Sequence, residues 1–173
     1  MKFHLVIIFI FIFVNKLNAM DLLHKNNLEN FNKEWEFISD QVMGGVSSGK
    51  VELISESQKN FIRLSGIVST ENNGGFIQFR SNFNFENQDF KGLRIKAKGF
   101  PSEYYVHIRT TFLFLPWQFY SSSFKVSEKW QTYELLFDDF KRSNFYQPSK
   151  FNSSEIESIG FVAFGKNFNP QLD

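Results

Sequence analysis

Hydrophobic and polar residues alternate with a period of two from Trp35 onward, and clusters of Gly, Asn and Ser interrupt the alternation about every eight to twelve residues. The alternation is clearest in residues 61–68, 93–98 and 106–110. Because successive side chains of a strand point to opposite faces, this pattern predicts strands with one buried face. No long stretch has an apolar stripe at helical spacing. The predicted strands are residues 34–39, 50–55, 61–69, 76–83, 92–98, 104–112, 118–126, 131–137 and 158–164.

Short strands separated by polar turns are typical of an antiparallel β-sandwich or barrel. The length of 173 residues fits one domain, and the sequence has no internal repeat, linker or second domain. We therefore predict an all-β, antiparallel domain. Residues 169–173 have the composition of a further strand, and we expect this last strand to be incomplete.

The N-terminus has a different pattern. Lys2 and His4 precede an uninterrupted apolar run over residues 5–14, and a short polar stretch then leads to Ala19. This arrangement is typical of a secretory signal peptide. The run is too short to cross a bilayer as a helix, and an uncleaved anchor or a buried strand is the alternative. We predict a signal peptide over residues 1–19, a polar lead-in segment over 20–33, a β-sandwich domain over 34–173, and a periplasmic or secreted protein.

Composition excludes several classes of protein. The chain has no Cys, which rules out disulfides, thiol catalysis and Cys-ligated metals. With 19 Lys and Arg against 18 Asp and Glu, it lacks the basic excess of a nucleic-acid-binding protein. Of the three His, only His107 lies in a predicted strand, so a multi-His metal site is not available. We therefore expect no metal, no cofactor and no nucleic-acid partner.

Acidic residues are the remaining candidates for chemistry. Asp40 and Glu71 form the pair that we would test for glycoside cleavage, which needs only two carboxyl groups at the right separation. Two acids in loops are expected by chance, however, and the chain has no nucleophile-elbow motif. The adjacent Asp138 and Asp139 supply fewer oxygens than calcium prefers, and we interpret them as turn residues. The sequence thus predicts a protein that is not an enzyme.

Two strings with paired glycines interrupt the strands, at residues 39–48 and 71–76. Paired glycines indicate backbone angles or close approaches that other residues do not tolerate. One interpretation makes the two loops the rim of a ligand site. The other makes them tight turns whose side chains satisfy local backbone donors. In the first interpretation the polar ligand contacts are Asp40, Ser47, Glu71 and Asn72.

These strings and several later positions resemble the complex I intermediate-associated protein 30 family. The resemblance runs in order over residues 34–165, with Leu136 standing where the family usually has Pro. It is most specific in the two loops, whose family-motif residues include Met43, Gly44, Gly45, Gly74, Gly75 and Phe76. The other matching residues are Trp35, Ser39, Asp40, Val42, Val46, Ser47, Phe61, Ser65, Gly66, Val68, Ser69, Glu71, Asn72, Gly92, Leu93, Lys98, Gly99, Tyr104, Arg109, Thr110, Phe124, Trp130, Phe137, Asp139, Phe140, Ile159, Gly160 and Phe161.

The resemblance implies a galactose-binding-like β-sandwich with a jelly-roll fold, and binding rather than catalysis. Mitochondrial members of the family are similar to chaperones that hold partly assembled respiratory complex I. An assembly protein with a protein client is therefore implied, and subunits of a respiratory complex are candidate clients. Mitochondrial members have an Arg-rich targeting segment at the N-terminus. This chain differs from them, because its N-terminus has the pattern of a secretory signal peptide. The fold is shared with many carbohydrate-binding modules, so an exported carbohydrate-binding module is the alternative.

Two features of the residues themselves fit a binding protein, which we expect to be at most peripheral to a membrane. Trp117 follows Pro116, and a turn there would leave the indole at a rim, where it could stack on a sugar or anchor a protein, whereas a Trp in the core or at a hydrophobic corner is the alternative. In addition, polar positions of three predicted strands would form an electropositive face for an acidic protein or an anionic glycan, although ordinary solvation of an outer face is the simpler alternative. The residues of this face are Gln78, Arg80, Arg94, Lys96, Lys98, His107 and Arg109.

Overall fold

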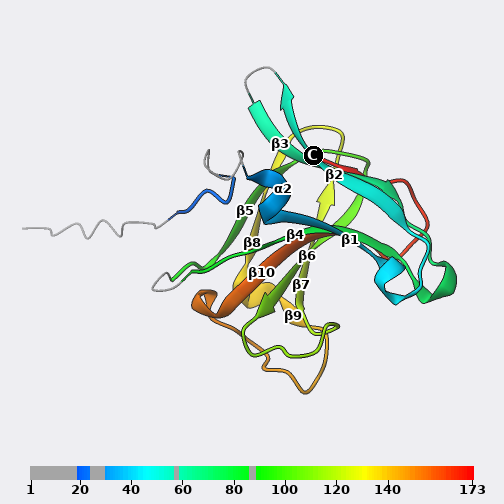
Figure 1. Ribbon diagram of the computed structural model, residues 1–173. Helices are drawn as coiled ribbons and strands as arrows, with labels where there is room; N and C mark the ends of the chain where they lie inside the picture. Colours follow the sequence, from blue (N-terminus) through cyan, green and yellow to red (C-terminus); the bar gives the residue numbers. More distant parts are fainter. Residues whose placement is uncertain (1–18, 24–29, 57–58, 86–88) are drawn as a thin grey trace, which may run out of the picture.

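The protein is an antiparallel β-sandwich of two layers (Figure 1), as the alternation predicts. The computed structural model describes residues 19–23, 30–56, 59–85 and 89–173, so the predicted signal peptide lies outside the described residues except for Ala19. Every predicted strand is present within a few residues of its predicted bounds. The elements are α2 (Phe31–Glu34), β1 (Trp35–Ser39), η1 (Asp40–Met43), β2 (Ser48–Glu56), β3 (Lys59–Ile67), η2 (Glu71–Asn73), β4 (Phe76–Asn82), β5 (Gly92–Ala97), β6 (Ser102–Thr110), β7 (Tyr120–Val126), β8 (Gln131–Leu136), η3 (Phe137–Asp139), β9 (Lys141–Arg142), η4 (Ser153–Glu155), β10 (Ile156–Phe164) and β11 (Gln171–Leu172).

The first layer is a six-stranded sheet in the order β1-β4-β10-β6-β7-β9, and all its neighbouring strands are antiparallel. β10 inserts between β4 and β6, so a late strand lies at the centre of the sheet. In this register Phe79 of β4 lies opposite both Phe37 of β1 and Phe161 of β10. The order is non-sequential, as in a jelly roll, and most of the sheet forms only from segments far apart in the chain.

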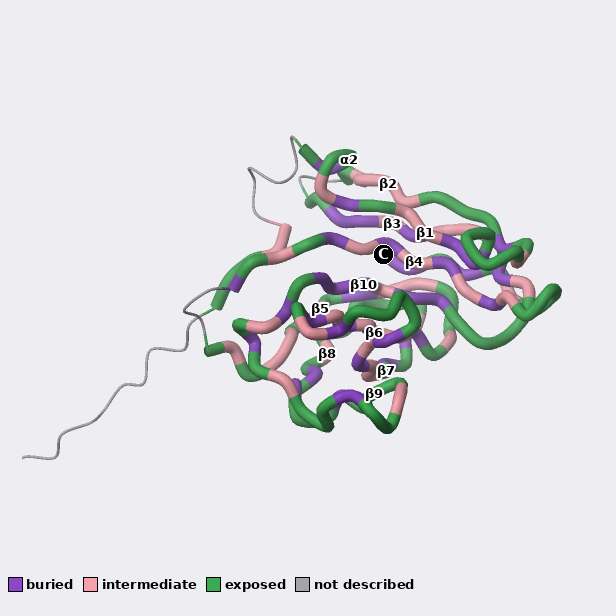
Figure 2. Tube along the Cα trace, turned by 60° about the horizontal axis from the view of Figure 1, so that its bottom comes forward, coloured by how far each residue is buried: buried purple, intermediate pink, exposed green. Residues whose placement is uncertain are grey.

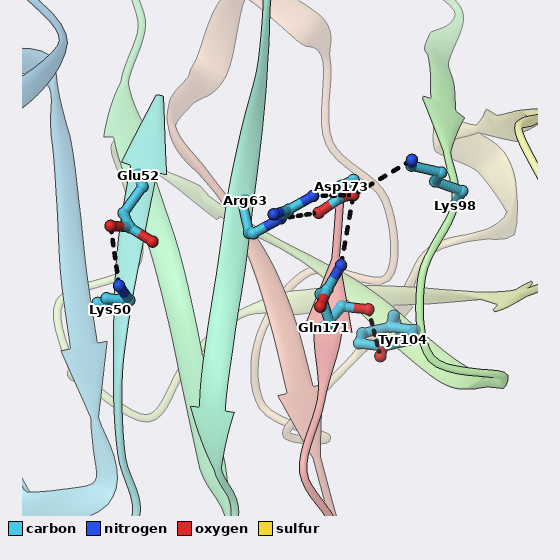
Figure 3. A network of polar contacts seen from close by, with 7 residues as sticks. All are labelled: Lys50, Glu52, Arg63, Lys98, Tyr104, Gln171 and Asp173. Carbon is cyan, nitrogen blue, oxygen red and sulfur yellow. Dashed lines mark hydrogen bonds and ion pairs between the residues drawn. The ribbon is translucent and has the colours of Figure 1, made fainter. Parts of the chain in front are cut away.

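The second layer contains β11-β3-β2 and the pair β5-β8. The two parts join where Lys98 and Asp173 exchange backbone hydrogen bonds of 2.9 and 3.1 Å. The Asp173 carboxylate accepts two hydrogen bonds from the Arg63 guanidinium, at 2.6 and 2.7 Å, and lies 3.7 Å from the Lys98 ammonium (Figure 3). Beside it, the Tyr104 hydroxyl of β6 donates to the Gln171 carbonyl at 3.1 Å. These contacts close the second layer and fasten it to the first.

One hydrophobic core fills the space between the layers, and Figure 2 shows buried segments recurring along the strands while most loops are exposed. Aromatic rings form much of this core, which accounts for many of the 24 Phe. Trp35 lies 5.3 Å from Phe79, and Phe79 stacks on Phe161 at 4.9 Å. Leu22, Leu23 and Phe31, from the segment that we expected to be a lead-in, also pack against the core. No helix in the described part of the chain is long and apolar enough to cross a membrane.

Candidate functional site

The two paired-glycine loops meet around one buried carboxylate, that of Asp40. This residue begins η1 directly after β1, and it is 0% exposed. One carboxylate oxygen accepts the Ser47 N–H at 2.9 Å, and the other accepts the Ser47 hydroxyl and the N–H groups of Gly75 and Phe76. The Ser47 hydroxyl oxygen also accepts the Ser69 N–H at 3.0 Å. One carboxylate thus holds two loops together that are far apart in the sequence.

This arrangement explains the glycines of both loops. A Cβ atom on Gly45 would lie 2.3 Å from the Asp40 Cγ, and one on Gly74 would lie 2.4 Å from an Asp40 oxygen. Gly44 and Gly75 have φ angles of +87° and +132°, in the region that favours glycine. Gly45 and Gly74 are therefore required because the Asp40 side chain lies too close for a Cβ atom. Gly44 and Gly75 are required because of their backbone conformation. The tight-turn interpretation accounts for all of them without a ligand.

Burial separates the four predicted rim contacts into two groups. Burial raises the pKa of Asp40, but hydrogen bonds from Ser47 and from the Gly75 N–H outweigh this effect and lower the pKa overall. Asp40 and Ser47 are both 0% exposed and hold the two loops together, and ligand contact through them stays a prediction. Glu71 and Asn72 are exposed in η2, and ligand contact through them stays a prediction.

The carboxylates considered for chemistry are not arranged as a reactive pair. The Asp40 carboxylate is buried and accepts four hydrogen bonds, whereas Glu71 is exposed in η2. Asp138 pairs with Lys150 at 2.7 Å, and this hydrogen bond lowers the pKa of Asp138. Within the described ranges, no group of three or more His, Asp or Glu side chains could hold a metal ion.

The first glycine loop also directs apolar side chains into solvent. Val42 and Met43 are 73% and 64% exposed, and Val46 is also exposed. We call these three residues the loop rim. The Gln41 side-chain amide donates to the Ser47 carbonyl at 2.9 Å, so the backbone beneath the rim is fixed. Sequence reasoning concentrated on the polar residues here, although apolar residues inside a string of Gly and polar residues were an available signal.

A second candidate surface lies on the outer face of the six-stranded layer. His107 stacks on Phe119 with ring centroids 4.0 Å apart, and Tyr105 meets Phe164 edge-on at 5.9 Å. We call these four residues the ring cluster. Burial lowers the pKa of His107 to about 4, so the imidazole is neutral near pH 7 and keeps both a donor and an acceptor. The sequence placed His107 on this face but did not predict the rings around it.

The predicted electropositive face is not formed. β4 and β6 belong to the first layer and β5 to the second, so their outer faces point in opposite directions. In addition, Arg80 pairs with Glu36 at 3.1 Å and Arg94 pairs with Glu134 at 2.9 Å. The cationic residues are thus divided between two surfaces, and several are neutralised there.

Arg109 organises the loop between β6 and β7. Its guanidinium donates to four carbonyl oxygens of residues 113–118, at distances from 2.8 to 3.2 Å. These bonds direct Arg109 to the loop, and ligand contact through it stays a prediction. Trp117 in the same loop is 55% exposed, so its expected place at a rim is confirmed. Its role as a ligand contact stays a prediction.

Comparison with solved structures shows the fold. The family 11 carbohydrate-binding module of the cellulosomal cellulase Lic26A-Cel5E of Clostridium thermocellum has a TM-score of 0.62 at 17% identity, over 81% of this chain and 84% of that chain. The family 11 module from Clostridium thermocellum in complex with a β-1,3-1,4-mixed-linked tetrasaccharide has a TM-score of 0.62 at 18% identity, over 81% and 85% of the two chains. At these identities the similarity establishes the sandwich fold alone.

Comparison of sequences gives the family. No curated protein matches this chain. The family described as Complex I intermediate-associated protein 30 (CIA30) matches residues 23–171, which include both glycine loops and nearly all of the sandwich. This chain therefore belongs to the complex I intermediate-associated protein 30 family.

Proposed function

We propose that this chain is a non-catalytic binding protein that holds a protein client through its loop rim. The observation that carries this proposal is the exposure of Val42 and Met43, at 73% and 64%, on a backbone fixed by a buried carboxylate. A surface that is already ordered loses less conformational entropy on binding, so more of the contact energy appears as affinity. Membership of the family supports an assembly role. Export by a cleaved signal peptide remains part of this proposal.

The chemistry of the loop rim favours a protein over a sugar. Val42 and Val46 are branched aliphatic residues and Met43 is a flexible thioether. Such side chains bury well against apolar protein surfaces, and Met adapts to partners of different shape. A sugar is instead recognised by aromatic faces together with polar groups, which the rim itself does not offer.

A photocrosslinking residue in place of Met43 tests the proposal in cells that make the protein natively. We expect ultraviolet light to link this position to a specific protein, which mass spectrometry then identifies. The pair Val42→Ser and Met43→Ser should weaken recovery of the same client about tenfold or more while unfolding at the same temperature as the wild type. Leu136→Ser, which changes an exposed residue of β8, is the matched control and should recover the client normally. Equal recovery with the rim variant would rule out the rim as the contact surface.

A glycan is the second candidate ligand, because the ring cluster offers aromatic faces beside polar groups. Gln78 and Tyr105 lie on the strands that flank β10 and pair there with the same residue, Val162. A neutral His107 next to these groups suits hydroxyl recognition. Titration with a β-1,3-1,4-linked tetrasaccharide tests this candidate calorimetrically. Heat of binding that Tyr105→Ala abolishes would favour the glycan, and no heat across a panel of β-glucans would count against it.

A further inference from the structure

Two loops at one end of the six-stranded layer expose a group of large hydrophobic side chains. The loop between β6 and β7 carries Phe114, Leu115 and Trp117, and the loop after β9 carries Phe145 and Tyr146. Figure 1 shows both loops extending below β7 and β9. Phe114 and Phe145 are 86% and 83% exposed, so they contribute almost nothing to the core. We call these five residues the aromatic tip.

The aromatic tip is held in one shape by polar contacts beneath it. Besides the Arg109 guanidinium, the buried amide of Gln147 donates to the Phe119 carbonyl at 2.9 Å. The Ser143 N–H donates to the same carbonyl at 2.9 Å, and the Trp117 indole N–H donates to the Tyr146 hydroxyl at 3.3 Å. These bonds join the two loops to each other. The rings are therefore displayed on an ordered scaffold and do not depend on a flexible loop.

The surroundings of the aromatic tip are cationic. Residues 109–126 and 140–154 contain no Asp or Glu, whereas the second range contains Lys141, Arg142 and Lys150. Lys141 and Arg142 are exposed on β9 and neither forms an ion pair within the described residues, although the Arg142 guanidinium donates to the Gln147 carbonyl at 2.8 Å. The acids that border this second range along the chain are Asp139 of η3 and Glu155 of η4, and Lys150 pairs with Asp138, which leaves Lys141 and Arg142 as the cations available to a partner. The aromatic tip thus has two exposed cations, Lys141 and Arg142, next to it on β9.

We propose that the aromatic tip docks the protein on a lipid bilayer with anionic headgroups. Trp and Tyr side chains favour the membrane interface because they combine an apolar ring with a polar group, and Phe side chains can enter the apolar region beside them. Basic residues next to the inserted rings attract anionic lipids. Ordered rings at the end of two loops, with cations beside them and no acids in either loop, have the complementary chemistry. The protein binds peripherally through this end, which leaves the loop rim free for a client.

Vesicles containing lipids with brominated acyl chains test the proposal directly on the full chain, because bromine quenches a Trp that enters the bilayer. The chain has three Trp, of which Trp35 is buried, and Trp130→Phe leaves Trp117 as the exposed reporter. We expect quenching with vesicles of phosphatidylcholine and about 30% phosphatidylserine, and weaker quenching with phosphatidylcholine alone or at high salt. Phe114→Ser with Phe145→Ser should lower vesicle partitioning about tenfold or more.

The control variants separate this proposal from the client-binding role. Val42→Ser with Met43→Ser removes two exposed apolar side chains elsewhere and should leave quenching unchanged. Lys141→Gln with Arg142→Gln should remove most of the preference for phosphatidylserine. If the chain sediments with vesicles while Trp117 is not quenched, another segment such as the apolar N-terminus makes the contact and the proposal is overturned. It is also overturned if the tip variant loses a protein client while its vesicle partitioning is unchanged.

Discussion

Replacement of Asp40 by Asn tests whether one carboxylate holds the two glycine loops together. The side chain accepts hydrogen bonds from the Ser47 N–H, the Ser47 hydroxyl and the N–H groups of Gly75 and Phe76. An Asn amide in the same place has one oxygen, so at least one of these donors must face an NH₂ group. The variant keeps the size of the side chain and removes its charge and half of its acceptors.

The expected magnitude follows from these contacts. One buried donor without a partner costs about 1–3 kcal/mol, and bonds to a neutral acceptor are each weaker than bonds to a charged one by about 1 kcal/mol. The easier burial of a neutral amide offsets part of that sum. We expect a net loss of about 3 kcal/mol in the free energy of unfolding, which is a large share of an ordinary domain's stability. The melting temperature should fall by about 6–12 °C.

Urea and thermal unfolding, followed by tryptophan fluorescence to which the buried Trp35 contributes, measure this loss. Asp139→Asn is the control, because the residue is exposed in η3 and its change should stay within about 0.5 kcal/mol. The pKa of Asp40 is lowered by folding, so its contribution is complete above the pKa of the unfolded chain and is lost as pH falls through the folded value. Wild type should therefore lose stability below about pH 4 faster than Asp40→Asn does. A loss under about 1 kcal/mol for Asp40→Asn at pH 7 would refute the holding role.

Three further predictions concern other sites. Gly74→Ala should destabilise by about 2 kcal/mol or more in urea unfolding, because its Cβ would lie 2.4 Å from an Asp40 oxygen, and an unchanged midpoint would contradict this. Arg63→Met should lower stability by about 3 kcal/mol in the same assay, because it leaves the buried Asp173 carboxylate without its two-bond partner. The imidazole of His107 should titrate by NMR with a pKa of about 4, because burial disfavours its charged form. The folded protein should therefore lose stability as pH falls from the pKa of the unfolded chain, about 6.5, toward about 4, and a measured pKa near 6.5 would show that the ring is solvated.

The sequence predicted the longer strands because their period-two pattern reports burial directly. Residues 61–68 alternate clearly, and β3 covers most of them. β9 was not predicted as a strand because it has only two residues, too few to show a period, whereas β11 lies within residues 169–173, where a further strand was expected. β11 pairs with Leu64 and Ser65 of β3, a partner that nothing in residues 169–173 identifies.

The candidate site was less predictable because its decisive facts are distances between remote segments. A string of Asp, Ser and paired glycines is expected both in a loop that contacts a ligand and in a loop that surrounds a buried carboxylate, so the sequence does not distinguish the two cases. Only the position of Asp40 against Gly74 and Gly75, far along the chain, distinguishes the two cases. The exposure of Trp117 could be predicted because Pro116 is adjacent in sequence. Its neighbour Tyr146 could not, since a separate loop supplies it.

The Arg63–Asp173 contact has a consequence for how the chain reaches this fold. It joins residues 110 positions apart, and it lies where the two parts of the second layer meet. A chain that is still being synthesised cannot close that layer until residue 173 is available, and the central strand β10 of the other layer is also late. Contacts of such long range slow folding, because a large loop must close before any of them forms. The sandwich should therefore form late, once residues up to 173 have been synthesised, and on the scale of about milliseconds to seconds that is usual for strand-rich domains, rather than strand by strand as each segment is made.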